Sequence, residues 1–355
     1  MRKGRFLLLP LARVRQVAYN LNYGIARPKH ISVMERSTLA LLSLFLLFRG
    51  CSSQPAPQTP PRHWATGQQP QLLAVYEPWW GHPAHISIGY SSHDPKEVKK
   101  QIDQAKKMGI SAFVVDWYGD RDPFNDITYA LVQKTAAKEH FHVAMMYDES
   151  NAEVGATDEA LADFRMFRDT YLAPNAPGRD AYLTYDGRPV IFIFPKGYHT
   201  DWDRVLQDLS QWNPQPFLIY ENVPGTYAKD FEGFYAWVNP GKGGWKSDGS
   251  DWGKDYLEDF YKTMATKYPD KMPVGGVWAG FDDSKASWGL NRHMDFRCGQ
   301  TFRDTFDLWK KFYPPDNPLQ YLLIETWNDY EEGTAIERGI PSCGSGGLQP
   351  ALPLH

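Results

Sequence analysis

The chain has 355 residues, of which 42% are hydrophobic and 23% are charged, a composition typical of a soluble globular protein. Its formal net charge is −4, which gives no reason to expect nucleic acid or an acidic polymer as a partner. Aromatic residues are numerous, with 13 Trp, 20 Tyr and 19 Phe, and many of them adjoin Gly, Pro, Asp or Asn. Rings in such polar surroundings suit stacking on the C–H faces of sugars, although we expect the majority of the aromatic residues to fill the core.

Residues 1–51 have the features of a targeting segment rather than of a folded domain. The run at 39–48, LALLSLFLLF, is too short to span a bilayer but suits the hydrophobic region of a signal peptide. Cys51 follows a glycine and precedes a Pro/Gln-rich linker at 52–69, which resembles a bacterial lipoprotein processing site, with ordinary signal cleavage as the alternative. We therefore expect a secreted, periplasmic or cell-surface protein, held at the membrane if Cys51 is lipidated.

Short apolar runs alternate with helical patterns from residue 72 onward, and eight of these runs have the length and composition of strands. We predict strands at 72–77, 112–117, 142–147, 189–194, 217–220, 233–237, 275–280 and 321–327. We predict helices from Asp94-Pro95, where Asp can cap and Pro fits the first turn, and over about 125–139, 157–171, 201–211, 251–268 and 301–313. These alternations predict a (β/α)8 TIM barrel, an α/β fold, as a single catalytic domain at 70–345.

The carboxyl-terminal end departs from the pattern of a complete barrel. After the last predicted strand the chain ends in RGIPSCGSGGLQPALPLH, a stretch rich in Gly, Pro and Ser that forms helices poorly. Either the last helix is missing or the sequence is truncated or frame-shifted here, and we assign residues 346–355 to a tail. Cys298 and Cys343 could form a disulfide in an oxidising compartment, but the sequence does not show whether they meet.

Barrel enzymes place their binding and catalytic residues at the carboxyl ends of the strands. In this chain those positions carry carboxylates, amides and aromatic rings, which is the composition of a sugar-binding cleft. We predict substrate-binding roles for Tyr76, Glu77, Trp79, Trp80, Asp116, Trp117, Tyr118, Tyr147, Asp148, Glu149, Glu221, Trp278, Trp327 and Asn328.

The segment after the eighth predicted strand is the most specific for a reaction. Glycosidic cleavage needs two carboxyl groups, one that protonates the leaving oxygen and one that acts as base or nucleophile. Asp329 and Glu332 supply such a pair three residues apart, with a glycine just beyond that lets the loop turn. A solvated acidic loop without a role is the alternative, and the position at a strand end favours catalysis.

These residues belong to segments that resemble a known enzyme family. The segment 327–337, WNDYEEGTAIE, resembles the signature of glycoside hydrolase family 99, the endo-α-mannosidases, and also a segment of family 71, the α-1,3-glucanases. Similarity to family 99 extends to 75–83 (VYEPWWGHP), 89–95 (GYSSHDP) and 113–119 (FVVDWYG). The likeness covers about residues 72–338, and therefore implies a glycoside hydrolase barrel.

The resemblance implies roles for the two carboxyl groups of the last segment. Glu332 matches the general acid, and Asp329 matches the second carboxylate, which is Glu in family 99 and Asp in family 71. Family 99 retains the anomeric configuration through an anhydro-sugar intermediate, whereas family 71 inverts it. Both stereochemical outcomes therefore remain open for this chain.

The resemblance also implies roles for residues near the other strand ends. An acidic residue that contacts substrate follows the third strand in family 99, and Asp148 or Glu149 is the candidate here. By the same likeness, the first-strand contacts correspond to Tyr76, Trp79 and Trp80.

Two residues of these segments receive distinct interpretations. Glu77 replaces an aromatic residue of the family pattern, which indicates a different subsite. Asn328 is expected to hold a hydroxyl group or to orient Asp329.

The remaining motifs do not indicate a metal or a cofactor. His82 and His85 share a loop, but no third ligand is evident nearby, so we expect no metal site there. We predict a monomeric hydrolase that cleaves α-glycosidic bonds in a polysaccharide or glycan, with endo action. An inverting α-1,3-glucanase-like hydrolase and a non-catalytic surface glycan-binding lipoprotein are the alternatives.

Overall fold

The computed structural model of the protein describes residues 62–239, 250–341, 343 and 348–349. The expected targeting segment lies outside these residues. Eight parallel strands close into a barrel in the order β1, β2, β3, β5, β6, β7, β8, β11, with β11 pairing back to β1. These strands are β1 (Gln71–Tyr76), β2 (Ile110–Trp117), β3 (His142–Asp148), β5 (Arg188–Phe194), β6 (Phe217–Glu221), β7 (Gly233–Tyr235), β8 (Met272–Val277) and β11 (Tyr321–Ile324).

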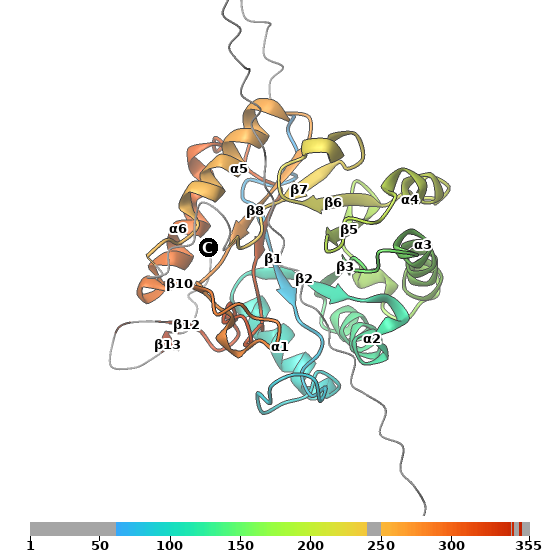
Figure 1. The fold of residues 1–355 in the computed structure, drawn as a ribbon, viewed down its shortest axis with the longest axis horizontal. Coiled ribbons are helices and arrows are strands. Elements are labelled where there is room, and N and C mark those ends of the chain that lie inside the picture. The colour runs from blue at the N-terminus through green and yellow to red at the C-terminus, as the bar shows by residue number, and fades with distance from the viewer. Residues whose placement is uncertain (1–61, 240–249, 342, 344–347, 350–355) are drawn as a thin grey trace, which may run out of the picture. The chain divides into compact units, whose positions relative to one another are not determined.

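Helices surround the barrel and follow most of its strands, as Figure 1 shows. They are α1 (Pro95–Lys107), α2 (Pro123–Lys138), α3 (Ala156–Phe167), α4 (Trp202–Leu209), α5 (Lys254–Lys267) and α6 (Gln300–Leu308). A π-helical turn, Arg168–Leu172, extends α3, and short 3-10 segments occupy Gly119–Arg121, Arg179–Ala181, Gly225–Lys229, Asp283–Lys285, Arg297–Gly299 and Trp309–Lys311. The predicted (β/α)8 TIM barrel, with its eight strand positions, is therefore confirmed.

Three short antiparallel pairs lie outside the parallel order of the barrel. One joins β4 (Thr184–Tyr185) to β5. The others join β9 (Phe281–Asp282) to β10 (His293–Met294) and β12 (Ile340–Pro341) to β13 (Leu348–Gln349). The β9–β10 pair matters for the site, because it belongs to the connection between β8 and α6 that reaches over the barrel's carboxyl-terminal end.

Side chains alternate across each barrel strand, since successive residues of a strand point to opposite faces. In β1, Leu73 and Val75 belong to the buried cluster inside the barrel, whereas Ala74 and Tyr76 belong to the cluster between strands and helices. Trp64, in the stretch that the sequence assigns to the linker, is also buried in the inner cluster and contacts Phe217, the first residue of β6. The barrel is therefore filled from its amino-terminal end, and its open end is the carboxyl-terminal one.

Local signals in the sequence set the beginnings of several helices. Asp94 caps α1 by accepting a hydrogen bond from the backbone N–H of Lys96 at 2.9 Å, and Pro95 occupies the first turn. Asp122 caps α2 in the same manner, followed by Pro123. Both patterns place a side-chain acceptor on N–H groups that have no partner within the helix.

The connections after β6 and β11 depart from the regular alternation. The link between β6 and β7 holds only a 3-10 segment, Gly225–Lys229. Beyond β11, the described residues contain no helix. The outer face of β11 is nevertheless buried, because Leu322 and Ile324 belong to the same cluster as Ile336 and Trp309.

A disulfide links Cys298 to Cys343, with 5.0 Å between their Cα atoms. It ties the segment before α6 to the carboxyl-terminal stretch, and the pairing that the sequence left open is therefore found. No helix among the described residues is both long and apolar enough to cross a membrane.

Candidate active site

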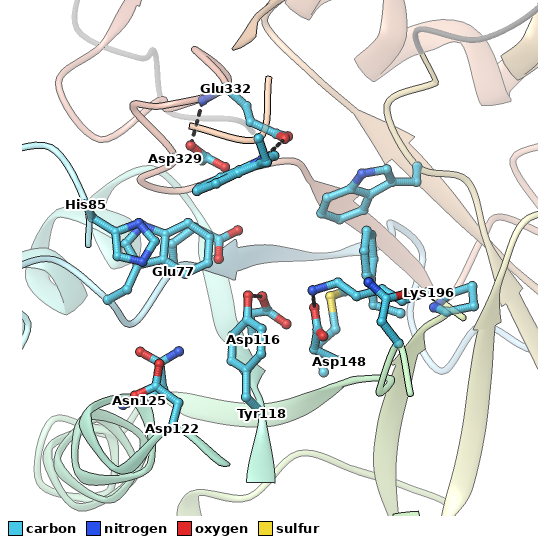
Figure 2. Close-up of a pocket in the computed structure, with 17 residues that line it drawn as sticks. Glu77, His85, Asp116, Tyr118, Asp122, Asn125, Asp148, Lys196, Asp329 and Glu332 are labelled. Atoms are coloured by element: carbon cyan, nitrogen blue, oxygen red, sulfur yellow. Dashed lines mark hydrogen bonds and ion pairs between the residues drawn. The ribbon is translucent and has the colours of Figure 1, made fainter. Parts of the chain in front are cut away.

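A cavity of about 640 Å³ opens at the carboxyl-terminal end of the barrel (Figure 2). Its walls carry mainly carboxyl groups and aromatic rings, which come from the strand ends and the loops that follow them. The lining residues are Glu77, Trp79, His85, Asp116, Tyr118, Asp122, Asn125, Met146, Asp148, Asn151, Phe194, Pro195, Lys196, Trp237, Trp288, Asp329 and Glu332.

Asp329 is held by the turn that follows β11. Its Oδ1 accepts hydrogen bonds from the backbone N–H groups of Glu331 at 2.9 Å and Glu332 at 2.8 Å. Its own N–H donates to the hydroxyl group of Thr326 at 2.7 Å, and that hydroxyl lies 3.0 Å from the hydroxyl of Thr334. The turn therefore fixes one oxygen of the carboxyl group and brings Asp329 and Glu332 to the same cavity.

Glu332 is held by the connection between β8 and α6. The indole N–H of Trp288 donates to its Oε1 at 2.9 Å, and its backbone carbonyl accepts from the N–H of Asp282, in β9, at 2.8 Å. Trp288 lies within a loop and remains 40% exposed, so this contact occurs at the rim of the cavity.

The surroundings favour the protonated form of both carboxyl groups. Burial raises the pKa of Asp329 well above its usual range, the charge of Glu332 adds to the rise, and the two backbone N–H bonds oppose it. Burial also raises the pKa of Glu332, and the hydrogen bond from Trp288 opposes that rise. A carboxyl group with a raised pKa can hold a proton near neutral pH, which is the requirement for a general acid.

A second group of charged side chains lies on the wall formed by β1, β2, β3 and the segment after β5 (Figure 2). Lys196 forms an ion pair with Asp148, with 2.6 Å between Nζ and Oδ2. The hydroxyl group of Tyr118 donates to Oδ2 of Asp116 at 2.7 Å. The side chain of Glu77 is buried and lies close enough to Asp116, Asp148 and the catalytic candidates to sense their charges.

Burial perturbs the ionisation of this second group as well. It raises the pKa of Glu77 well above its usual range, and the charges of Asp116 and Asp329 add to the rise. It raises the pKa of Asp116, and raises that of Asp148 to about 8, while the charge of Lys196 opposes both rises. Although burial lowers the pKa of Lys196, the charges of Asp148 and Asp116 outweigh this effect and raise it above its ordinary value.

An aromatic wall faces these carboxyl groups. The rings of Trp79 and His85 are stacked, with centroids 4.7 Å apart and an interplanar angle of 7°, and Trp288 meets both of them edge-on. Nδ1 of His85 lies 2.7 Å from Oε2 of Glu331, which orients the imidazole ring. Flat rings beside carboxyl groups provide a stacking surface and hydrogen-bond acceptors in one cavity.

The structure brings seven of the sequence-predicted residues together in the cavity wall: Glu77, Trp79, Asp116, Tyr118, Asp148, Asp329 and Glu332. Their roles in binding and catalysis stay predictions.

Three aromatic residues that were predicted to contact substrate point away from the cavity: Tyr76, Trp117 and Tyr147. Their polar atoms donate to side chains on the helix side, namely Gln101 at 2.8 Å, Asp126 at 3.0 Å and Asp163 at 3.1 Å, respectively. The strand alternation explains this correction, because each of them directly precedes or follows a residue that points inward.

The loop residues Trp80, Trp327 and Asn328 are buried behind the cavity wall, which corrects their predicted contact with substrate. The side-chain amide of Asn328 forms two hydrogen bonds with the backbone of Glu77. Oδ1 of Asn328 accepts from the N–H of Glu77 at 2.7 Å, and Nδ2 of Asn328 donates to the carbonyl of Glu77 at 3.0 Å. Asn328 therefore joins the two loops that carry Glu77 and Asp329, instead of holding a hydroxyl group of a ligand.

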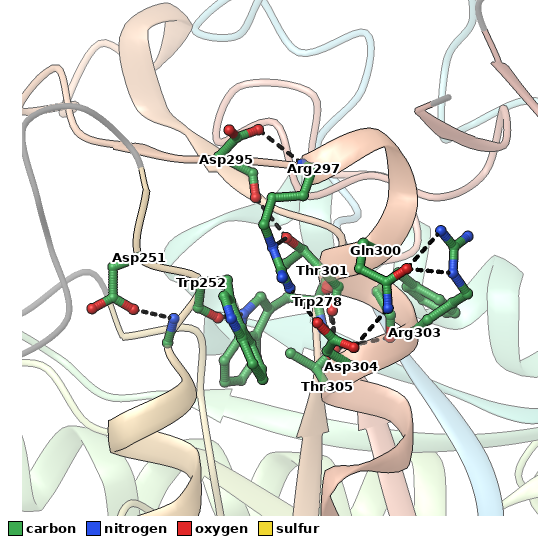
Figure 3. Close-up of polar contacts among 12 residues, drawn as sticks. Asp251, Trp252, Trp278, Asp295, Arg297, Gln300, Thr301, Arg303, Asp304 and Thr305 are labelled. Carbon is green, nitrogen blue, oxygen red and sulfur yellow. Dashed lines mark hydrogen bonds and ion pairs between the residues drawn. The ribbon is translucent and has the colours of Figure 1, made fainter. Parts of the chain in front are cut away.

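Trp278 is likewise buried away from the cavity, between the barrel and the helices that follow β7 and β8 (Figure 3). Its indole N–H donates to the backbone carbonyl of Trp252 at 2.9 Å, and the guanidinium group of Arg297 lies 4.7 Å from the centre of the Trp252 ring. Arg297 also donates to Asp304 at 2.7 Å. This cluster stabilises the region beside the disulfide, which corrects the prediction of a substrate contact for Trp278.

Two carboxylates predicted to bind substrate do not line the cavity either, Glu149 and Glu221. Oε2 of Glu149 accepts from the backbone N–H of Lys196 at 3.0 Å, and Oε1 of Glu221 accepts from the side chain of Asn222 at 2.6 Å. Of the two acidic candidates after the third strand, it is therefore Asp148 that faces the cavity.

Several lining residues were not among the candidates predicted from sequence. Lys196 is the second residue after β5 and could have been found by the rule that listed residues after the other strands. Asn125 lies in the first turn of α2, and Trp288 lies between β9 and β10, where no periodic pattern marks a residue as facing the cavity. Loop residues of this kind need the folded structure to be recognised.

The fold is similar to that of three solved structures. Two structures of the family 99 endo-α-mannosidase from Bacteroides thetaiotaomicron, one of them in complex with Bis-Tris propane, match with TM-scores of 0.59 at 19% and 18% identity, over 80% of this chain and 92% of theirs. A glycoside hydrolase-like protein matches with a TM-score of 0.56 at 14% identity, over 80% of this chain and 90% of that chain. No family model and no curated protein matches the sequence. The likeness to family 99 that the motifs indicated is confirmed at the level of the fold.

Proposed function

We propose that the protein is a glycoside hydrolase that cleaves α-glycosidic bonds in a polysaccharide or glycan. The observation that carries the proposal is the pair Asp329 and Glu332, which face one cavity at the carboxyl-terminal end of the barrel. The family 99-like sequence around this pair and the shared fold of endo-α-mannosidase structures support an α-linked substrate and endo action.

In the proposed reaction, Glu332 acts as the general acid. It donates its proton to the glycosidic oxygen as the bond from that oxygen to the anomeric carbon breaks. Its raised pKa supports this role, because it favours the protonated form that a general acid needs. The N–H of Trp288 afterwards stabilises the carboxylate that remains.

Asp329 acts as the second carboxyl group and must be ionised to do so; the two backbone N–H bonds to its Oδ1 favour that form, against the burial that raises its pKa. One of its oxygens accepts two backbone N–H bonds, which leaves the other oxygen to remove a proton from water or from a neighbouring hydroxyl group of the sugar. Proton removal from water leads to inversion at the anomeric carbon, whereas removal from the sugar hydroxyl leads through an anhydro sugar to retention. Proton NMR of the first product formed distinguishes the two outcomes.

The experiment that tests the function is reducing-end release from a panel of α-mannans, α-1,3-glucans and related α-linked glycans, with wild-type protein and Glu332→Gln. The buffer should be free of amines, since a structure with the same fold was obtained in complex with Bis-Tris propane. We expect the wild type to cleave at least one of these glycans, which identifies the substrate, and we expect Glu332→Gln to lose this cleavage. Binding of a glycan without cleavage by either protein would contradict hydrolysis and favour a sugar-binding lipoprotein.

We further propose that the chain is exported through its amino-terminal segment. The Cys298–Cys343 disulfide supports this, because disulfides persist mainly in oxidising compartments. Mass spectrometry of the mature amino terminus tests the proposal: a diacylglyceryl-modified Cys51 indicates a lipoprotein, cleavage nearby without lipid indicates a secreted protein, and an uncleaved terminus contradicts both.

A further inference from the structure

Four buried oxygen atoms on side chains that line the cavity have no hydrogen-bond donor. They are Oε2 of Glu77, Oδ1 of Asp116, Oδ1 of Asp148 and Oδ1 of Asn125, and none has a partner among the described residues. The four side chains are 4%, 7%, 2% and 2% exposed, so bulk water does not solvate them freely. Buried acceptors without a donor destabilise a protein unless water or a ligand supplies the donors.

Acidic groups in the cavity also outnumber cationic ones; their mutual repulsion adds to the raised pKa of Glu77, and a bound cation would favour its ionised form. Six of the lining residues are carboxylic acids, whereas Lys196 and His85 are the cationic candidates among them. Both are already engaged, Lys196 with Asp148 and His85 with Glu331. Glu77 and Asp116 form no ion pair with any residue in the described part of the chain.

We propose that the sugar bound beside Asp329 and Glu332 is an amino sugar, whose ammonium group is held by Glu77 and Asp116. The proposal rests on the function proposed above and names its substrate class. Figure 2 shows Glu77, Asp116 and Asp148 across the cavity from Glu332, and all four line the cavity in which the sugar would bind.

The chemistry of an ammonium group suits these oxygen atoms better than that of a hydroxyl group. An ammonium group offers three N–H donors, no acceptor and one positive charge, whereas each hydroxyl group brings one donor together with acceptor lone pairs. Charge-assisted hydrogen bonds to carboxylates are also about twice as strong as neutral ones. A resident metal ion is the competing cation, but no group of three or more His, Cys, Asp or Glu side chains in the described residues is arranged to hold one.

The test measures binding by calorimetry with the Glu332→Gln protein, so that no probe is cleaved. The probes are the methyl α-glycosides and α-linked disaccharides of glucosamine, galactosamine and mannosamine, each beside its 2-hydroxyl and 2-acetamido counterparts. The same probes are titrated into Glu332→Gln combined with Glu77→Gln or with Asp116→Asn, and the unfolding midpoint of each variant is recorded. Glu258→Gln on the same background is the matched control, because Glu258 pairs with Lys254 and Lys311 on the outside of the barrel.

We expect at least one amino sugar to bind about tenfold more tightly than its hydroxyl counterpart. Glu77→Gln or Asp116→Asn should reduce this preference to about twofold, whereas the control Glu258→Gln should keep it. Equal or tighter binding of the neutral sugars, or a preference that neither cavity variant reduces in folded protein, would overturn the proposal. Ca²⁺ or Mg²⁺ that binds at these carboxylates and excludes the amine would overturn it as well. Hydrolysis is measured separately. If neutral glycans are cleaved while amino sugars fail to bind, the proposed hydrolase function stands and the amino-sugar proposal is overturned. If amino sugars bind but the wild type never cleaves them, only the proposed hydrolase function is contradicted.

Discussion

The hydrogen bond from Trp288 to Glu332 gives a specific prediction about the pH dependence of activity. Replacing Trp288 with Phe removes the N–H that donates to Oε1 at 2.9 Å but keeps an aromatic ring at the rim of the cavity. This bond stabilises the ionised form of Glu332, so its loss raises the pKa of the carboxyl group. If Glu332 is the general acid, the alkaline limb of the pH profile must move to higher pH.

The size of the shift follows from the strength of the bond. A hydrogen bond to a charged group contributes about 1.5–3 kcal/mol, and each pKa unit corresponds to about 1.36 kcal/mol. Because Trp288 is 40% exposed, water replaces part of the lost bond and the lower end of this range applies. We therefore expect the alkaline limb of kcat/KM to move up by about one pH unit.

Trp79→Phe is the matched control for this experiment. Trp79 belongs to the same aromatic wall, but its indole N–H has no hydrogen-bond partner in the described residues. Its replacement should change KM and leave the alkaline limb in place. A limb that stays fixed in Trp288→Phe, or that moves equally in both variants, would refute the assignment of Glu332 as the group that controls this limb.

Three further predictions concern stability, each measured by urea unfolding. Cys298→Ser removes a crosslink between residues 45 apart and should lower the free energy of unfolding by about 4 kcal/mol under oxidising conditions, with no effect under reducing ones. Burial raises the pKa of Glu221 from 4.5 to about 8, so the folded protein keeps a proton that the unfolded chain loses. The free energy of unfolding should therefore decrease as the pH rises from about 4.5 to about 8, and Glu221→Gln should make this decrease smaller. An unchanged dependence on pH in the variant would contradict the prediction. Asp94→Ala should cost about 1 kcal/mol through the lost cap of α1, and a cost near zero would show that the cap does not stabilise the fold.

The barrel could be predicted because each of its strands is a short apolar run bounded by turn residues. The run at 189–194, for example, is apolar on both faces, as expected for a parallel strand covered by helices outside and side chains inside. Helix starts were readable where Asp precedes Pro, as at Asp94. The Cys298–Cys343 pair was not determined by sequence, because the two residues meet only after the barrel has closed.

The site was predictable only in part. Its position at the strand ends and the pair Asp329 and Glu332 follow from sequence, whereas the direction of each side chain does not follow from proximity to a strand end. Tyr76 and Trp117 flank inward-facing residues and therefore point outward. Trp288 reaches the cavity from a loop whose path depends on the pairing of β9 with β10.

The proposed reaction depends most directly on Glu332 as the proton donor to the leaving group. This is tested by comparing wild type and Glu332→Gln on the glycan that the wild type cleaves and on the dinitrophenyl glycoside of the same sugar, whose leaving group departs without a proton. We predict that the variant loses about 10²–10⁴-fold in kcat on the glycan but stays within about tenfold of the wild type on the dinitrophenyl glycoside. An equal loss on both substrates, or no loss on the glycan, would contradict the assignment of Glu332 as the general acid.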